Sequence, residues 1–439
     1  MSKRLILILT LAFVVGIAYA AYAEVQNVKV GGDITAIGLM RELDLNNNQG
    51  GTESKDKYQD MLSIVRVKID ADLTDNVSTT IRLINDRYWG SSERSSDNSD
   101  IDLDLAYVTL KEFLYSPATL TIGSQELRFG NGMIIGDPTT NNRRSGDSNI
   151  AIIDADLDMR KAFDAVRLTL NYDPLVLDIV GAKVEENEQN NEDDINLYGI
   201  NANYALSKTT TLEAYWFEKH SQRKANLQNK PDRIDVLGGR VVTQPIENLT
   251  YQLEAAYQLG KSVLSATNVA NRRAWALETS LTYAMPNVRY SPSLTALYNY
   301  FSGRRGNDEK KDTAWNPMFE DQTAGNIANI QIDQSNCHVA GVIASAKPMD
   351  DVKLIGEYYA YWWDKRYGDG QVVTSVRGDS LTMKNKKFAG QEIDLKTVYD
   401  YTEDVQFSLM TGIFLPGSSF DKANDNTATE VIGSMKVTF

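Results

Sequence analysis

Apolar and polar residues alternate with a period of two along most of the chain. In the segment 249–259, Leu249, Tyr251 and Leu253 fall on one face, and Thr250 and Gln252 on the other. Because successive side chains of a strand point to opposite faces, this pattern predicts strands with one apolar and one polar face. These segments last about ten residues, the length that a tilted strand needs to cross a bilayer.

The pattern recurs to the last residue and predicts eighteen strands. They are expected at residues 25–41, 58–73, 76–90, 101–111, 118–129, 160–172, 174–187, 194–205, 208–219, 232–243, 246–259, 273–285, 289–301, 336–347, 349–363, 386–400, 403–415 and 427–439.

The lengths of the connections decide between a soluble β-sandwich and a barrel. Even-numbered strands are followed by short connections such as Gln244-Pro245, and most odd-numbered strands by longer ones, of which 130–159 and 302–335 are the longest. A sandwich gives no reason for this asymmetry, whereas an outer-membrane barrel has short periplasmic turns and long external loops. We therefore predict an all-β fold: one transmembrane, antiparallel, up-and-down β-barrel over residues 24–439, with both termini in the periplasm.

The two ends of the chain favour the same location. Lys3 and Arg4 precede an apolar run at 5–18, and Ala21-Tyr22-Ala23 has the pattern that signal peptidase recognises. We expect a signal peptide at residues 1–23, because the apolar run is short for an uncleaved anchor of roughly 20 residues. The last strand ends on Phe439, which resembles the signal that hands outer-membrane barrels to their assembly machinery. Outer-membrane lipid and that machinery are the expected partners.

Aromatic residues gather toward the ends of several predicted strands. The clusters lie at 215–217, 298–301 and 358–363. Such rings would form the interfacial girdles of a membrane barrel, although core packing could explain each cluster by itself.

Composition and candidate chemistry exclude several classes of protein. The net charge of −14 argues against nucleic acid as a partner. The lone Cys337 can complete neither an intramolecular disulfide nor a metal cluster. Of the two histidines, His220 begins a predicted loop and His338 could face Ser335, but no orienting acid or oxyanion hole marks a hydrolase. We expect no enzyme and no cofactor.

An acidic segment raises the question of a metal site. Asp97, Asp100, Asp102 and Asp104 could gather calcium at an external rim, yet a solvated acidic loop is the simpler interpretation. We therefore expect no resident metal.

The strand pattern also predicts which charged residues line the pore. The basic candidates are Arg66, Lys68, Arg82, Arg160, Arg167, Lys353 and Lys396, and the acidic candidates include Asp102, Asp104 and Glu254. Two interpretations remain open. Arg66, Arg82 and Arg167 could form a basic strip with Arg160 at its external end, or the charges could neutralise each other between neighbouring strands.

Two features near the fifth strand bear on the width of the pore. The connection 130–159 is expected to fold partly into the mouth and narrow it. Arg128 has the parity of an outward residue unless Gly123 marks a bulge, so its direction is left open.

Four motifs carry a resemblance to a known family. They are Gly123-Ser124-Gln125-Glu126-Leu127-Arg128-Phe129-Gly130-Asn131-Gly132 with Arg160, Phe163-Asp164 and Arg167 after it, Trp315-Asn316-Pro317-Met318-Phe319, Gly390-Gln391-Glu392-Ile393-Asp394-Leu395, and Phe414-Leu415-Pro416-Gly417. As a set they resemble the alginate-export porin family, in the same order over roughly residues 30–439. Ser124 and Met133 stand where that family usually carries arginine.

The resemblance implies an eighteen-stranded outer-membrane barrel that passes an anionic polysaccharide. The predicted function is thus an outer-membrane channel or porin for an anionic solute, such as an acidic oligo- or polysaccharide. The alternative is a structural barrel scaffold that docks a secretion or electron-transfer partner. The chain has no haem motif, so it would not carry electrons itself.

Overall fold

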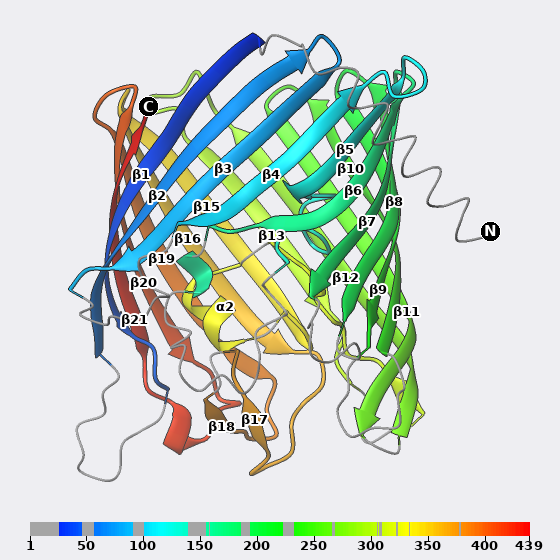
Figure 1. The fold of residues 1–439 in the computed structure, drawn as a ribbon. Helices are drawn as coiled ribbons and strands as arrows, with labels where there is room; N and C mark the ends of the chain where they lie inside the picture. Colours follow the sequence, from blue (N-terminus) through cyan, green and yellow to red (C-terminus); the bar gives the residue numbers. More distant parts are fainter. Residues whose placement is uncertain are drawn as a thin grey trace.

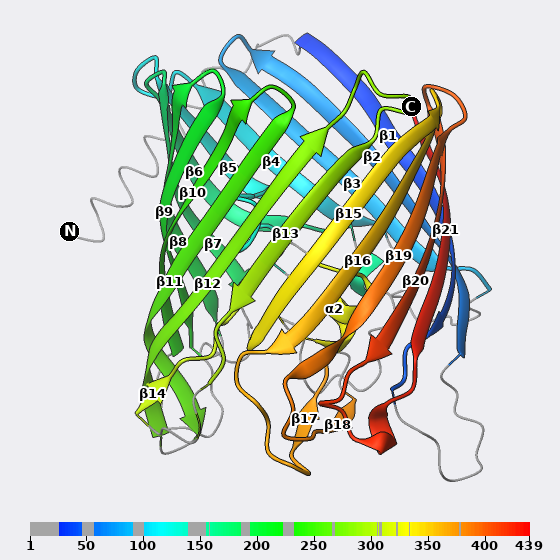
Figure 2. The ribbon, with the colours of Figure 1, turned by 180° about the vertical axis from the view of Figure 1, so that it is seen from behind.

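A computed structural model confirms the predicted barrel (Figures 1 and 2). Eighteen strands form one closed antiparallel sheet, in which β1 pairs with both β2 and β21. The structure describes residues 26–45, 57–90, 101–138, 155–157, 159–185, 194–222, 232–265, 268–304, 306, 310–321, 324–332, 334–376 and 379–439.

Every predicted strand has a counterpart in the barrel wall. These are β1 (Gln26–Glu42), β2 (Lys57–Thr74), β3 (Val77–Tyr88), β4 (Asp102–Lys111), β5 (Ala118–Glu126), β6 (Ala162–Asn171), β7 (Leu175–Glu185), β8 (Ile195–Ser207), β9 (Thr210–Ser221), β10 (Asp232–Ile246), β11 (Leu249–Ser265), β12 (Asn268–Ala284), β13 (Ser293–Phe301), β15 (Cys337–Met349), β16 (Val352–Trp363), β19 (Phe388–Asp400), β20 (Val405–Pro416) and β21 (Ala428–Thr438). The connections hold the short elements η2 (Ala155–Leu157), β14 (Lys311–Asp312), α2 (Ile327–Gln331), β17 (Val372–Thr374), β18 (Ser380–Thr382) and η3 (Lys422–Asn424).

The two rims of the barrel differ as the connection lengths predict. Short turns such as 208–209 and 247–248 lie at the rim that also holds the C-terminus, here called the turn rim. The longer connections, with β17 and β18, lie at the opposite end, here called the loop rim (Figure 1). None of the helices in the described ranges has the length and apolar character of a membrane span. The predicted signal peptide lies outside the described residues, so its cleavage remains a prediction.

The junction between the first and last strands and the apolar outer face agree with the alternating pattern. Phe439 continues the last strand, since its backbone exchanges hydrogen bonds of 2.9 and 3.0 Å with Gly32 of β1. Apolar side chains such as Trp275, Leu237 and Leu395 are exposed on the outside, where lipid would cover them.

Some strand ends differ from the prediction. β11 and β12 form a hairpin that reaches Ser265 and Asn268, beyond the predicted limits of 259 and 273. β13 begins at Ser293 rather than at 289. The preceding Pro292 has no N–H for the ladder, and Tyr290 and Ser291 have positive φ angles of 69° and 41°, which belong to a turn.

The aromatic clusters do not all belong to interfacial girdles. Tyr298 and Tyr358 are exposed on the outside, as predicted, but Tyr215, Phe217 and Tyr361 are buried inside the barrel. Alternation places neighbouring rings on opposite faces, and the inward rings find an apolar partner in the lumen. That partner is a pair of segments folded into the barrel.

Candidate functional site in the barrel lumen

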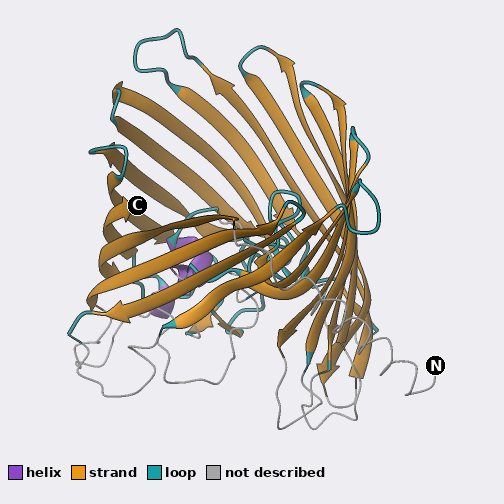
Figure 3. Cartoon of the chain, turned by 45° about the horizontal axis from the view of Figure 1, so that its top comes forward, coloured by secondary structure: helices purple, strands orange, loops and turns teal. Residues whose placement is uncertain are grey.

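Two chain segments enter the barrel from the loop rim and dock on each other. The first infolded segment (127–138) follows β5, and the second infolded segment (313–321 and 324–332) follows β13 and contains α2. Gly136 N–H donates to the carbonyl of Phe319 at 2.7 Å, and Asp321 N–H to that of Gly132 at 2.8 Å. Figure 3 shows the helical residues inside the ring of strands. For residues 130–138, the prediction that connection 130–159 folds inward is confirmed; residues 139–154 and 158 lie outside the described residues.

The infolded segments give the lumen an apolar core. Leu127, Met133 and Phe319 are fully buried in one cluster with inward rings of the wall. Phe129 packs against Phe217 of β9 with ring centroids 5.3 Å apart. Burial of such side chains is worth roughly 1.5–3 kcal/mol each, which accounts for the stability of chain segments placed in a channel.

Two wall glutamates hold the first infolded segment. Glu213 of β9 accepts the N–H of Gly130 at 2.9 Å, and Glu254 of β11 accepts the N–H of Asn131 at 2.8 Å. Tyr215 O–H donates to the other oxygen of Glu254 at 2.7 Å. The side chain of Glu254 is completely buried. Glu254, one of the acidic pore-lining candidates, is therefore an anchor for a backbone N–H group and is not exposed to the pore.

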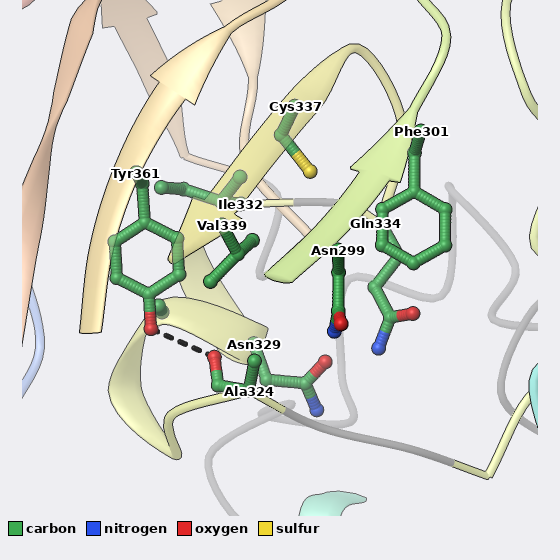
Figure 4. A pocket seen from close by; sticks show the side chains of 10 residues that line it. Asn299, Phe301, Ala324, Asn329, Ile332, Gln334, Cys337, Val339 and Tyr361 are labelled. Carbon is green, nitrogen blue, oxygen red and sulfur yellow. Dashed lines mark hydrogen bonds between the residues drawn. The ribbon is translucent and has the colours of Figure 1, made fainter. Parts of the chain in front are cut away.

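Glu392 of β19 holds the second infolded segment in the same way. Its two oxygens accept the N–H groups of Ile327 and Ala328, at 2.8 and 2.7 Å. These are first-turn groups of α2, which have no partner within the helix. Tyr361 O–H donates to the carbonyl of Ala324 at 2.7 Å (Figure 4).

The backbone passes so close to Glu254 and Glu392 that two positions in the infolded segments require glycine. Gly130 and Gly325 have positive φ angles of 62° and 82°. A Cβ atom at Gly130 would lie 2.4 Å from Glu254 Oε1, and one at Gly325 would lie 2.6 Å from Glu392 Oε2. The Gly130-Asn131-Gly132 motif thus lets the backbone reach a buried carboxylate.

Five of the predicted pore-lining bases form ion pairs with carboxylates. The pairs are Arg66 with Asp33 (2.8 Å), Lys68 with Asp70 (3.0 Å), Arg82 with Asp104 (2.5 Å) and Glu126 (2.6 Å), Arg160 with Asp86 (2.8 Å) and Asp102 (2.7 Å), and Arg167 with Asp178 (2.7 Å).

Of the two open interpretations of the lumen charges, this pairing favours mutual neutralisation over a basic strip. Arg66, Arg82 and Arg167 all reach the lumen, but each has at least one acidic partner on its own wall, so the strip carries no net positive charge. Charges in a water-poor wall pair in this way because isolated ones are costly to bury. Lys353 and Lys396 are exposed and form no ion pair with any residue in the described ranges.

A surplus base lies where the two infolded segments meet. Arg128 of the first segment and Lys161, just before β6, both form ion pairs with the single carboxylate of Asp321. The three side chains are 48%, 35% and 23% exposed, so solutes in the lumen can reach them. Arg128 points inward because β5 ends at Glu126 and the chain then turns into the barrel. Nothing in the sequence pattern marked Lys161 or Asp321.

The described residues form neither the Ser/His pair of a hydrolase nor a metal site. Ser335 Oγ donates to the carbonyl of Trp315 at 2.7 Å, and His338 Nδ1 lies 2.7 Å from Tyr298 O–H, so the two are not paired. Within the described ranges, no three His, Cys, Asp or Glu side chains are placed to hold a metal ion. Asp102 binds Arg160, while Asp97 and Asp100 lie outside the described residues.

Comparison with solved structures shows the same barrel fold. OccK11 (OpdR) of Pseudomonas aeruginosa is 11% identical, with 94% of this chain and 96% of that chain covered and a TM-score of 0.56. The outer membrane protein opdK from Pseudomonas aeruginosa is 9% identical, with 94% and 99% covered and a TM-score of 0.56. Acinetobacter baumannii OccAB3 is 10% identical, with 94% and 99% covered and a TM-score of 0.57.

Sequence comparison identifies the family. No curated protein matches the chain. The model of the alginate export family matches residues 39–434, nearly the whole length. This match includes most of the barrel wall, both infolded segments and the four motifs that carry the resemblance. The chain belongs to the alginate export family and forms an outer-membrane β-barrel of the porin type.

Proposed function

We propose that the protein is an outer-membrane channel that passes anionic solutes, with acidic oligo- and polysaccharides as the substrate class. The observation that carries the proposal is the group of Arg128, Lys161 and Asp321. Two bases share one carboxylate, which leaves one positive charge at the junction of the two infolded segments. Family membership points to the same class of solute.

Burial separates the charges that a solute meets from those that it does not. Glu254 and Glu392 are fully buried and direct their oxygens at backbone N–H groups. Arg128 and Lys161 are partly exposed in the narrowed lumen. Two unit charges 4 Å apart interact by about 4 kcal/mol at the effective dielectric constant of a protein surface, so one surplus base is enough to favour anions.

Single-channel recording of the purified protein in planar bilayers tests the proposal. The reversal potential in a salt gradient is expected to show anion selectivity, and acidic oligosaccharides are expected to block the current. Lys161→Gln leaves Arg128 and Asp321 as a neutral pair, so it should shift the reversal potential toward cations and weaken the block. A protein that conducts no current would instead favour the scaffold alternative.

A matched control separates this effect from a general loss of charge. Lys208→Gln removes the same charge from an exposed turn, residues 208–209, at the turn rim, and should leave selectivity unchanged. A cation-selective wild type, or equal reversal potentials for Lys161→Gln and the wild type, would refute the proposal.

A further inference from the structure

A second polar site lies at the loop rim, apart from the lumen charges. A cavity of about 440 Å³ opens between the connection after β13, the connection after β16 and the connection after β20. This volume is within the roughly 300–1,000 Å³ of small-molecule sites. The surplus-base group of Arg128, Lys161 and Asp321 contributes none of its lining residues.

Three cationic side chains line this cavity: Arg304, Lys365 and Arg366. Lys365 Nζ is bound to Asp364 at 2.7 Å. Arg304 and Arg366 are exposed, and neither forms an ion pair or hydrogen bond with a residue that the structure describes. Unlike most described lumen arginines, both therefore present their guanidinium groups to the cavity without a carboxylate partner in the described ranges, and a carboxylate of a ligand can bind them.

Aromatic rings and amides complete the lining. Trp363 and Tyr367 pack edge to face with centroids 5.1 Å apart, and Phe420 lies beside Trp363 at 6.4 Å. Trp363 Nε1 donates to Ser419 Oγ at 2.8 Å, which fixes the indole from behind. Gln371 adds an amide to the lining. Apolar ring faces with a few placed polar groups are typical of small-molecule sites.

Hydrogen bonds within the protein hold the connections around the cavity in place without a ligand. Asn336 joins two of the three connections, since its Nδ2 donates to the carbonyl of Lys365 at 3.0 Å and its Oδ1 accepts the N–H of Lys365 at 2.7 Å. The N–H of Asp364 donates to the carbonyl of Asn336 at 2.9 Å. A preformed site loses less entropy when it binds a ligand.

The floor of the cavity belongs to the second infolded segment. Ile332 lines both the cavity and a smaller inner pocket of about 20 Å³. In Figure 4 that inner pocket lies among Ile332, Cys337 and Tyr361. It has room for about one water molecule. An occupant of the cavity would therefore rest on the segment that narrows the lumen.

We propose that this cavity is a docking site for one or two units of a carboxylate-bearing sugar at the loop rim of the channel. The two arginines pair with the carboxylate, the rings of Tyr367 and Trp363 pack against the C–H face of the pyranose, and the amide of Gln371 binds a hydroxyl group. The inference rests on the proposed function, because it names where an acidic saccharide first meets, or last leaves, the channel.

Isothermal titration calorimetry of the full-length protein in detergent tests the site. The probe is an oligouronate of four units, compared with the same oligosaccharide after its carboxyl groups have been reduced to alcohols, and with inorganic phosphate. Arg304→Gln/Arg366→Gln should weaken oligouronate binding at least about tenfold. Tyr367→Ala should weaken it while leaving both charges in place. The control Lys208→Gln/Arg289→Gln removes two charges at the turn rim and should bind like the wild type.

Each of the possible results supports or overturns the docking site. Weaker binding in the arginine variant and in Tyr367→Ala, with the turn-rim control unchanged, supports the site, and equal binding by the arginine variant overturns it. Equal affinity for the reduced oligosaccharide overturns the carboxylate assignment, and equal competition by inorganic phosphate overturns the sugar assignment. A wild type that is anion-selective and blocked by acidic oligosaccharides, while Arg304→Gln/Arg366→Gln binds oligouronate like the wild type, overturns the docking site and leaves the proposed function standing.

Discussion

Two parts of the barrel wall use their carboxylates in different ways. On the wall from β1 to β7, acids such as Asp33, Asp104 and Asp178 bind arginine side chains of adjacent or nearby strands. On the wall from β9 to β19, Glu213, Glu254 and Glu392 bind backbone N–H groups of the infolded segments. The first arrangement neutralises the wall, and the second holds the content of the lumen in place.

The two arrangements also differ in how far apart their partners lie in the sequence. Asp178 and Asp33 lie 11 and 33 residues from their arginines. Glu392 and Glu254 lie 65 and 123 residues from the N–H groups that they bind. Strand register predicts contacts of the first kind, while those of the second kind depend on where a long connection folds. Loss of a glutamate anchor should therefore alter the channel, whereas loss of an aspartate partner should alter the stability of the wall.

The largest effect is expected for Glu392→Ala. This change leaves the N–H groups of Ile327 and Ala328 buried without an acceptor, at a cost of about 2–5 kcal/mol to the docking of the second infolded segment. Release of the segment widens the lumen, so single-channel conductance should rise and fluctuate between levels. Planar-bilayer recording measures both.

The aspartate wall supplies the control for this experiment. Asp178→Ala removes a partner of Arg167 but touches neither infolded segment, so its conductance should stay close to that of the wild type. An unchanged conductance in Glu392→Ala, or an equal rise in Asp178→Ala, would show that the two walls do not differ in the way proposed.

The strand architecture could be predicted because it depends on local patterns. Period-two alternation and the two classes of connection length were enough for eighteen strands and for the placement of residues such as Arg66 and Asp104 on the lumen side. Cross-strand pairing of their charges was one of two interpretations that remained open. Register alone could not choose between them, because it shows which residues are neighbours and not whether each charge finds a partner.

The content of the lumen could be predicted only in part. The length of connection 130–159 indicated an infolded loop, but no such prediction was made for connection 302–335, which is at least as long and contains the second infolded segment. Phe217 and Tyr361 were assigned to girdles because alternation separates two faces without saying what covers each of them. Glu254 was assigned to a pore lining because its backbone partner, Asn131, is distant in sequence and belongs to an irregular segment.

A medium effect, on stability alone, is expected for Arg82→Gln. The change leaves Asp104, whose side chain is 1% exposed, without its cation. Loss of one partner of a buried pair costs several kcal/mol, and the partial exposure of Glu126 reduces this to about 2–3 kcal/mol. The unfolding midpoint in urea should fall while conductance stays unchanged.

The double variant Arg82→Gln/Asp104→Asn sharpens this prediction. It removes the stranded charge together with its partner, so most of the lost stability should return. A double variant as unstable as the single one would mean that Arg82 stabilises the wall by packing rather than by pairing.

The smallest effect is a pH dependence at the loop rim. There Asp364, outside the membrane-spanning strands, accepts a backbone N–H as the anchoring glutamates do. Burial by itself raises the pKa of Asp364, but hydrogen bonds from Lys365 Nζ (2.7 Å) and Gly303 N–H (2.8 Å) outweigh it and hold the pKa below its ordinary value. A lowered pKa means that the stabilisation is complete above the ordinary aspartate pKa of about 3.9 and is lost as the pH falls through the lower folded value. Exchange of the Gly303 amide hydrogen, corrected for its intrinsic rate, should therefore accelerate roughly tenfold over that acidic range, as expected for the loss of one hydrogen bond to a charged group. Asp364→Asn should show fast exchange at every pH, and a wild type whose corrected rate stays constant below pH 4 would place the anchor of Gly303 elsewhere.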